Sequence, residues 1–159
     1  MQYKNLASAD HPATIIILVN ISESMGGPTA DGKTRIEVAK DAILNIYTTM
    51  VKRSLMQGQI KPRYRIGMVT YSDNLYDVYG NGQKQESILT IKEIVDQCAP
   101  SIASQGWTDT LKKTIMAKAF HYATHLIKED IKTWPEKWLA ECPSPMVINI
   151  TDCEYVEGL

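Results

Sequence analysis

Small polar side chains follow an apolar run near the N-terminus. Residues 15–19 are five consecutive aliphatic residues, and Asn20, Ser22 and Ser24 then occupy every second position. The run is too short to cross a bilayer, and its β-branched composition predicts a strand that is buried on both faces. Ligands of open parallel sheets bind at the carboxyl ends of strands, so these three side chains are the first candidates for a functional site. The alternative is an ordinary solvated turn, in which Ser and Asn are common.

Two later segments offer further oxygen ligands. Residues 146–150 (MVINI) read as a second, mainly apolar strand, which is followed by Thr151 and Asp152. Residues 106–110 (GWTDT) are a hydroxyl-rich segment that opens a predicted helix. Three separate loops could therefore supply hydroxyl, amide and carboxylate oxygens, which are the ligands that hard divalent cations prefer.

The order and spacing of these residues resemble the metal-ion-dependent adhesion site of the von Willebrand factor type A family. In that family the first motif reads DxSxS, a threonine lies in a loop before a helix, and an aspartate ends the fourth strand. The resemblance covers nearly the whole chain. It implies an α/β fold with a doubly wound, mostly parallel sheet flanked by helices, similar to a Rossmann fold. It also implies five metal ligands: Asn20, Ser22, Ser24, Thr108 and Asp152.

The first motif position departs from the family pattern, because Asn20 replaces its aspartate. The loss of one carboxylate weakens the attraction for Mg²⁺, or for Mn²⁺ or Ca²⁺ in its place. Glu23 and Glu154 lie beside the two motifs, and we hypothesise that they restore the missing negative charge. Alternatively, both glutamates are simply solvated.

The resemblance implies a non-catalytic domain that recognises another protein. A metal ion would bridge the hydroxyls to an acidic side chain of the partner, and Trp107, beside the key threonine, would be an aromatic anchor at the rim with Glu23 and Glu154. The sequence is more similar to intracellular, bacterial-type members of the family than to adhesive ones. A metal-free scaffold with the same fold is the alternative.

A nucleotide-binding enzyme is a third possibility, because residues 27–34 (GPTADGKT) formally fit the P-loop pattern. The context argues against it, since a P-loop follows its strand directly, whereas here NISES lies between strand and glycine. His121 and His125 lie four residues apart, as zinc ligands on a helix do, but Tyr122 stands where a catalytic glutamate would. A serine hydrolase is disfavoured, because no glycine-flanked nucleophile elbow is present.

Composition favours one globular domain in a reducing compartment. The chain has 159 residues, 44% hydrophobic content and a net charge of −1, which leaves no basic field for nucleic acid. Its three cysteines form no CxxC pair, and the N-terminus lacks a basic stretch followed by a long apolar segment. We therefore expect a cytoplasmic protein that binds neither nucleic acid nor membranes.

Hydrophobic periodicity predicts the helices. Apolar residues at helical spacing indicate a helix from Thr34 to about Gln57 that buries Ala39, Ile43 and Tyr47 among others. Further helices are predicted at 88–98 and 110–129, with a partly helical connector at 134–141. The resemblance to the family implies two more strands, its second strand at 65–72 and its short antiparallel edge strand at 75–79.

The predicted sheet looks incomplete beside its last strand. We assign residues 1–12 to an N-terminal extension and 13–159 to the type A domain, in which the family's last two strands are not evident. The outer edge of the strand at 146–151 would then lie open. Open apolar edges recruit other strands, so we expect this edge to pair across a chain boundary, in a homo-oligomer or with a partner, or to be covered in another way.

Overall fold

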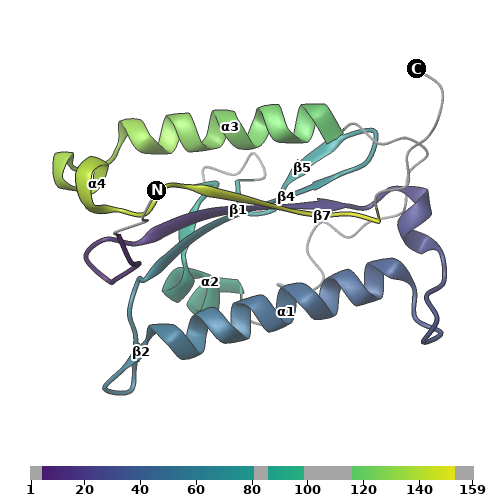
Figure 1. The fold of residues 1–159 in the computed structure, drawn as a ribbon, viewed down its shortest axis with the longest axis horizontal. Coiled ribbons are helices and arrows are strands. Elements are labelled where there is room, and N and C mark those ends of the chain that lie inside the picture. Colours follow the sequence, from purple (N-terminus) through teal and green to yellow (C-terminus); the bar gives the residue numbers. More distant parts are fainter. Residues whose placement is uncertain (1–4, 81–85, 99–115, 153–159) are drawn as a thin grey trace.

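The computed structural model describes residues 5–80, 86–98 and 116–152, and a central sheet lies between two helical layers (Figure 1). This arrangement confirms the predicted α/β class with a mostly parallel sheet. The elements are β1 (Ala13–Asn20), η1 (Glu23–Gly26), α1 (Arg35–Ser54), β2 (Leu55–Met56), β3 (Gln59–Ile60), β4 (Tyr64–Tyr71), β5 (Leu75–Asp77), β6 (Leu89–Thr90), α2 (Ile91–Cys98), α3 (Met116–Lys132), α4 (Glu136–Glu141) and β7 (Met146–Ile150).

The main sheet has the strand order β5-β4-β1-β7. β1 lies between β4 and β7 and runs parallel to both, while β5 and β6 pair antiparallel with β4. Val19 pairs with Ile150, so the carboxyl ends of β1 and β7 lie at the same end of the sheet. This register brings the residues that follow the two strands together, although more than 120 positions separate them along the chain.

Two hydrophobic clusters hold the helices on the sheet. On one face, Ile15, Ile17 and Val19 of β1 pack with residues of α1 and α2. On the other face, Ile16 and Leu18 pack with residues of α3. Alternate residues of β1 thus enter opposite clusters, as the two-sided burial predicted from its aliphatic run requires. Figure 1 shows α1 and α2 on one side of the sheet and α3 on the other.

The helix predicted from Thr34 to Gln57 ends earlier, at Ser54. Leu55–Met56 and Gln59–Ile60 pair instead as a short antiparallel hairpin. Its turn contains Gln57 and Gly58 with φ angles of 51° and 73°, in the left-handed region that glycine adopts readily. The inward face of the helix agrees with the prediction, because Ala39, Ile43 and Tyr47 are buried.

Other boundaries shift by a few residues. The edge strand predicted to end at Tyr79 ends at Asp77, and the helix predicted from Ile88 begins at Ile91 because residues 89–90 form β6. α3 extends to Lys132, beyond the predicted end at Glu129, and residues 110–115 of that prediction lie outside the described segments. His121 and His125 are exposed on the surface of α3.

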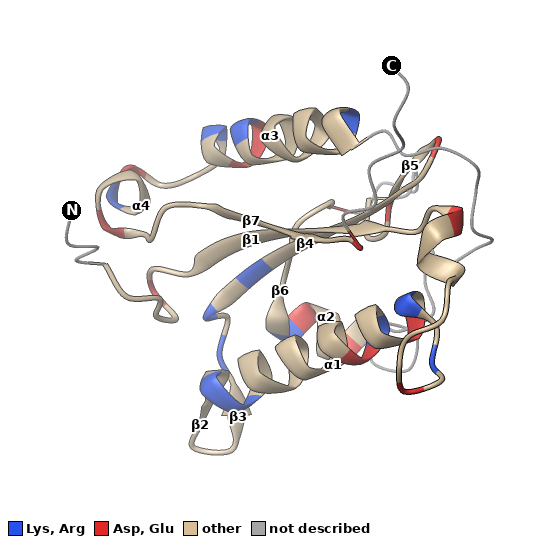
Figure 2. Cartoon of the chain, turned by 45° about the vertical axis from the view of Figure 1, so that its right-hand side comes forward, with Lys and Arg blue, Asp and Glu red and all other residues tan. Residues whose placement is uncertain are grey.

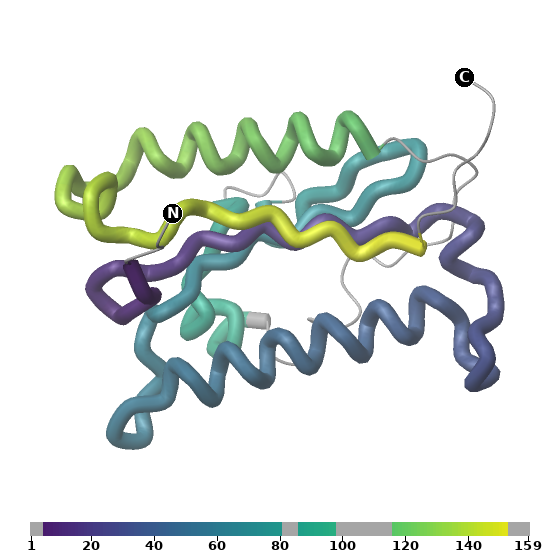
Figure 3. Tube along the Cα trace, in the orientation of Figure 1, coloured from purple at the N-terminus to yellow at the C-terminus, as the bar shows by residue number. Residues whose placement is uncertain are grey.

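β7 is the outermost strand of the described part of the sheet, and Figure 3 shows it running alongside β1. Val147–Ile150 are only partly buried, and Met146 is 55% exposed. None of the helices in the described segments combines the length and the apolar composition needed to cross a membrane. In Figure 2, acidic and basic residues are interspersed along the helices, whereas the strands carry few charges.

Candidate functional site

A series of polar contacts connects the ends of β1 and β7, and the peptide bond between Thr151 and Asp152 closes it into a ring. Asn20 donates from Nδ2 to Thr151 Oγ1 at 3.0 Å, and its Oδ1 accepts the backbone N–H of Ser22 at 2.8 Å. The hydroxyls of Ser22 and Ser24 lie 3.1 Å apart and share a hydrogen bond. We call the six residues that form this series the polar ring: Asn20, Ser22, Ser24, Arg35, Thr151 and Asp152.

Arg35 closes the polar ring. Its Nη1 donates to the Ser24 carbonyl oxygen at 3.1 Å and to Asp152 Oδ2 at 2.9 Å. The Asp152 side chain is only 5% exposed, and that of Arg35 is 33% exposed. A carboxylate this deeply buried requires a positive partner or several hydrogen-bond donors, and the guanidinium supplies both kinds of interaction.

The start of α1 holds Arg35 in place, because Arg35 is the first residue of that helix. The preceding Thr34 is the N-cap, and its hydroxyl accepts the backbone N–H of Glu37. The Glu37 carboxylate in turn accepts the Thr34 backbone N–H at 2.7 Å and its hydroxyl at 2.9 Å. This reciprocal capping box orients the first turn of α1. The same two hydrogen bonds to Thr34 lower the pKa of Glu37 below its usual value.

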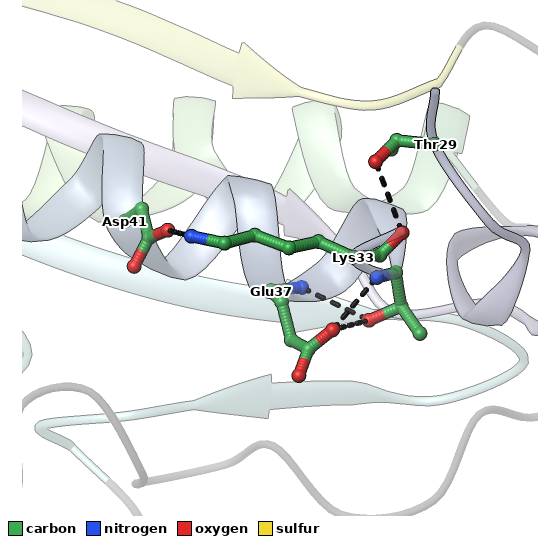
Figure 4. A network of polar contacts seen from close by, with 5 residues as sticks. Thr29, Lys33, Glu37 and Asp41 are labelled. Atoms are coloured by element: carbon green, nitrogen blue, oxygen red, sulfur yellow. Dashed lines mark hydrogen bonds and ion pairs between the residues drawn. The ribbon is translucent and has the colours of Figure 1, made fainter. Parts of the chain in front are cut away.

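The loop that formally fits a P-loop is folded onto itself. Lys33 Nζ donates to Asp41 Oδ2 at 2.6 Å, and this contact raises the Lys33 pKa (Figure 4). The backbone N–H groups of Thr29 and Gly32 donate to carbonyl oxygens within the loop. A P-loop needs its lysine and these N–H groups turned toward phosphate. The geometry therefore disfavours the nucleotide-binding alternative.

The residues of the polar ring do not fit a divalent cation in this arrangement. Mg²⁺ needs oxygen ligands with a negative balance of charge. Asp152 is the only carboxylate of the polar ring, and Arg35 neutralises it. Asn20 Oδ1 already accepts the backbone N–H of Ser22, and the hydroxyls of Ser22 and Ser24 bond to each other. The described segments also contain no group of three or more His, Cys, Asp or Glu side chains that could hold a metal ion.

The structure thus brings together four of the five predicted ligands, Asn20, Ser22, Ser24 and Asp152, and adds Arg35, which the sequence analysis missed. A signal existed: an arginine at the start of a helix just after the first motif, and an aspartate without an assigned counter-charge. Thr108, Trp107 and Glu154 lie outside the described residues, so their predicted roles stay predictions. Glu23 is exposed in the first turn of η1, beside the polar ring.

An open groove of about 370 Å³ lies beside the polar ring. Residues of α1 and of the end of β7 line it, and Arg35 and Asp152 are its charged lining residues. The remaining lining is mostly apolar and comes from four segments: Met25 of η1; Thr29; Val38, Ala39 and Ala42 of α1; and Ile150 and Thr151 at the end of β7. The ring therefore borders a surface where an apolar side chain of another molecule could be buried.

Comparison with solved structures shows the same fold elsewhere. A crystal structure of an uncharacterized membrane-spanning protein from Vibrio fischeri matches with a TM-score of 0.52 and 15% sequence identity. The match covers 78% of this chain and 52% of the other, so the chain spans about half the length of that protein. No curated protein sequence matches the chain.

The family assignment comes from the sequence pattern of the whole fold. The model of the von Willebrand factor type A domain matches residues 15–152, a range that begins in β1 and ends at the last residue of the polar ring. It includes β1 from Ile15 onward, the other described strands of the main sheet and the buried residues of both hydrophobic clusters. The chain belongs to the von Willebrand factor type A domain family.

Proposed function

We propose that the chain is a non-catalytic domain that recognises another protein at the end of the sheet formed by the polar ring, η1 and the adjacent groove. The observation that carries this proposal is the convergence of Asn20, Ser22, Ser24 and Asp152 at the carboxyl ends of β1 and β7. Domains of this family are commonly protein-interaction domains. Ligands of open parallel sheets also bind at this end.

The arrangement of the serines supports recognition over catalysis. Ser22 is 4% exposed, and its hydroxyl bonds to that of Ser24, whereas a nucleophilic serine is exposed and bonded to a base. The two histidines that could act as a base are exposed on α3. Ser22 therefore serves the conformation of the loop, and Glu23 of η1 presents an exposed carboxylate to a partner.

A comparison of three immobilised proteins tests this function. Wild type, Glu23→Lys and the control Glu136→Lys would be incubated with extract of the source organism, and the retained proteins quantified by mass spectrometry. Glu136 is exposed like Glu23 but begins α4, at the other end of the sheet (Figure 1). We expect a protein that wild type and Glu136→Lys retain and Glu23→Lys loses. Equal retention by all three would contradict the proposed surface.

Nucleotide binding can be excluded by a simple measurement. We expect that ATP with Mg²⁺ leaves the melting temperature of the chain unchanged, because the loop at 27–34 is bonded internally. A ligand that binds only the folded state must raise the melting temperature. A concentration-dependent rise that is lost in Lys33→Ala but not in Lys52→Ala would favour the enzyme alternative instead.

A further inference from the structure

We propose that Arg35 supplies, from within the chain, the positive charge that a metal ion would bring to this site, so that the polar ring is complete without a divalent cation. The inference deepens the proposed function and rests on it for one consequence only, that partner binding does not require metal. The assignment of charge rests on the geometry of Arg35 and Asp152.

The first step of the argument is charge balance. Asp152 is the one carboxylate of the polar ring, it is nearly buried, and its Oδ2 lies 2.9 Å from Arg35 Nη1. A divalent ion beside Asp152 would lie close to the guanidinium, and like charges at short range repel strongly where water is excluded. Binding of such an ion would therefore require Arg35 to leave.

The second step is that Arg35 is held in its position. Its Nη1 also donates to the Ser24 carbonyl oxygen, and its own backbone N–H donates to the Gly27 carbonyl oxygen at 2.9 Å. The Thr34 cap fixes the first turn from which the side chain extends. An ion would have to displace a guanidinium that is anchored to η1, to α1 and to Asp152, which makes displacement costly.

The third step concerns Asn20. A neutral amide at this position leaves the polar ring with equal positive and negative charge, and both ends of the amide are used: Nδ2 donates to Thr151 and Oδ1 accepts from Ser22. An aspartate could not donate to Thr151, and it would add an unbalanced negative charge at a position that is 2% exposed. The neutral side chain of Asn20 and the positive charge of Arg35 are therefore both consistent with a polar ring that holds no metal ion.

Metal titration of designed variants tests the assignment. The proteins are wild type, Arg35→Gln, Asn20→Asp and the double variant Arg35→Gln/Asn20→Asp, with Arg53→Gln as control. Arg53 is an exposed arginine in the last turn of α1. Binding of Mg²⁺ is measured by calorimetry, and binding of Mn²⁺ by loss of the paramagnetic resonance signal of the free ion. Circular dichroism establishes that each variant is folded.

We expect neither wild type nor Arg53→Gln to bind either ion. The double variant should bind, with an affinity at least about tenfold above that of Asn20→Asp, since it loses a repelling charge and gains a carboxylate. A further variant, Arg35→Lys, should bind neither ion, as we expect of wild type, because it keeps the positive charge.

A second further variant, Asp152→Asn, serves as a check on wild type. Binding of Mn²⁺ by wild type that is lost in Asp152→Asn would overturn the proposal, even if the double variant fails to fold. A double variant that is folded and binds no more tightly than Asn20→Asp would also overturn it.

The partner experiment separates this inference from the proposed function. A partner that wild type retains equally in Mg²⁺ and in EDTA, and that Glu23→Lys loses, would support both. A partner lost in EDTA would overturn metal independence while the recognition function stands. Equal retention by wild type and Glu23→Lys would overturn the function, and the titrations would still decide the role of Arg35.

Discussion

Arg35 and Asp152 form the ion pair of the polar ring. Asp152 is 5% exposed, so loss of its counter-charge leaves a carboxylate that water reaches poorly. We expect Arg35→Met to lower the free energy of unfolding by about 2 kcal/mol, because a hydrogen bond between charged groups is lost. Asp152→Asn should lower the free energy of unfolding less in the Arg35→Met background than in wild type. A double-mutant cycle would show this, with urea denaturation of wild type, the two single variants and the double variant.

The exposed ion pair between Lys33 and Asp41 is the control for this cycle. Both of its side chains are 55% exposed, and its N–O distance is 2.6 Å. A pair of this kind contributes little to stability, so we expect a coupling energy much smaller than that of Arg35 and Asp152. Coupling between Arg35 and Asp152 that is no larger than in this pair would contradict the role of Arg35 as the counter-charge.

At the scale of single residues, sequence reasoning named four of the six residues that the structure brings together in the polar ring. Asn20, Ser22, Ser24 and Asp152 each follow an apolar run, and parallel strands place such residues at one end of a sheet. Arg35 was missed because its hydrogen-bond partner Asp152 lies 117 positions further along the chain. The adjacent GKT sequence also indicated Lys33, the lysine of the P-loop pattern, as the candidate basic residue. Pairing of charges over such separations depends on tertiary structure, which local patterns do not contain.

The capping box of α1 determines how well the helix start is formed. Thr34→Ala removes the hydroxyl that accepts the Glu37 N–H, and we expect a loss of about 1 kcal/mol of stability. The lowered pKa of Glu37 adds a pH dependence: its stabilising effect is present above the pKa of the unfolded state and disappears as pH falls through the lower pKa of the folded state. Thermal denaturation from pH 7 to pH 3 would measure both effects.

Glu37→Gln is the matched variant for the pH dependence. A glutamine side chain can still accept the Thr34 N–H, as capping boxes allow, but it does not titrate. We expect the stability of Glu37→Gln to fall less steeply than that of wild type over the acidic range. Identical slopes would show that Glu37 contributes nothing to acid denaturation.

A second pair of charges joins β4 to α3. Arg65 donates from Nη1 and Nη2 to the two oxygens of Asp130 at 2.6 and 2.7 Å, with both side chains at most 13% exposed. Trp134 Nε1 donates to Asp130 as well, and the Arg65 guanidinium lies 5.5 Å from the centre of the Trp138 ring. The start of β4, the end of α3 and α4 are thereby connected.

We expect Asp130→Ala to lower the free energy of unfolding by about 3 kcal/mol, because it leaves Arg65 buried without its carboxylate. Glu129→Ala is the control, since Glu129 is exposed and pairs only with Lys132 among the described residues, so its loss should lower the free energy of unfolding far less. Urea denaturation would measure both. Similar losses in the two variants would contradict the importance of the buried pair.

Among the elements, those with strong periodicity were predicted best. The inward face of α1 followed from apolar residues at helical spacing, and β1 followed from its continuous aliphatic run, whereas β4 followed from the family resemblance. β6 and the β2–β3 hairpin were missed because each of their strands has two residues, too few for any alternation to appear. The position of β6 is decided by pairing of Leu89 with Ile66, which is a tertiary contact.

At the scale of the whole molecule, the described part of the sheet ends in β7, a strand that resembles a central one. Ile148 and Ile150 pack toward the cluster under α1, and Val147 packs toward the cluster under α3. A strand with apolar residues on both faces is typical of a sheet interior, yet β7 pairs only with β1 among the described strands. The mostly parallel sheet flanked by helices was predictable from the family resemblance, whereas whatever covers this edge was not.

Among the described strands the outer edge of β7 has no neighbour, and this leads to a prediction about association. Unpaired apolar edges form hydrogen bonds with strands of other chains, and lysine placed on an edge opposes such pairing. We expect wild type to self-associate with rising concentration in sedimentation experiments, and the amides of residues 146–150 to gain protection from hydrogen exchange over the same range.

Met146→Lys should weaken this association without unfolding the chain, because Met146 is 55% exposed. Leu139→Lys is the control, since Leu139 is 60% exposed on α4, and it should associate as wild type does. A chain that stays monomeric, with slow exchange at the amides of β7 at every concentration, would show that another part of the same chain covers the edge.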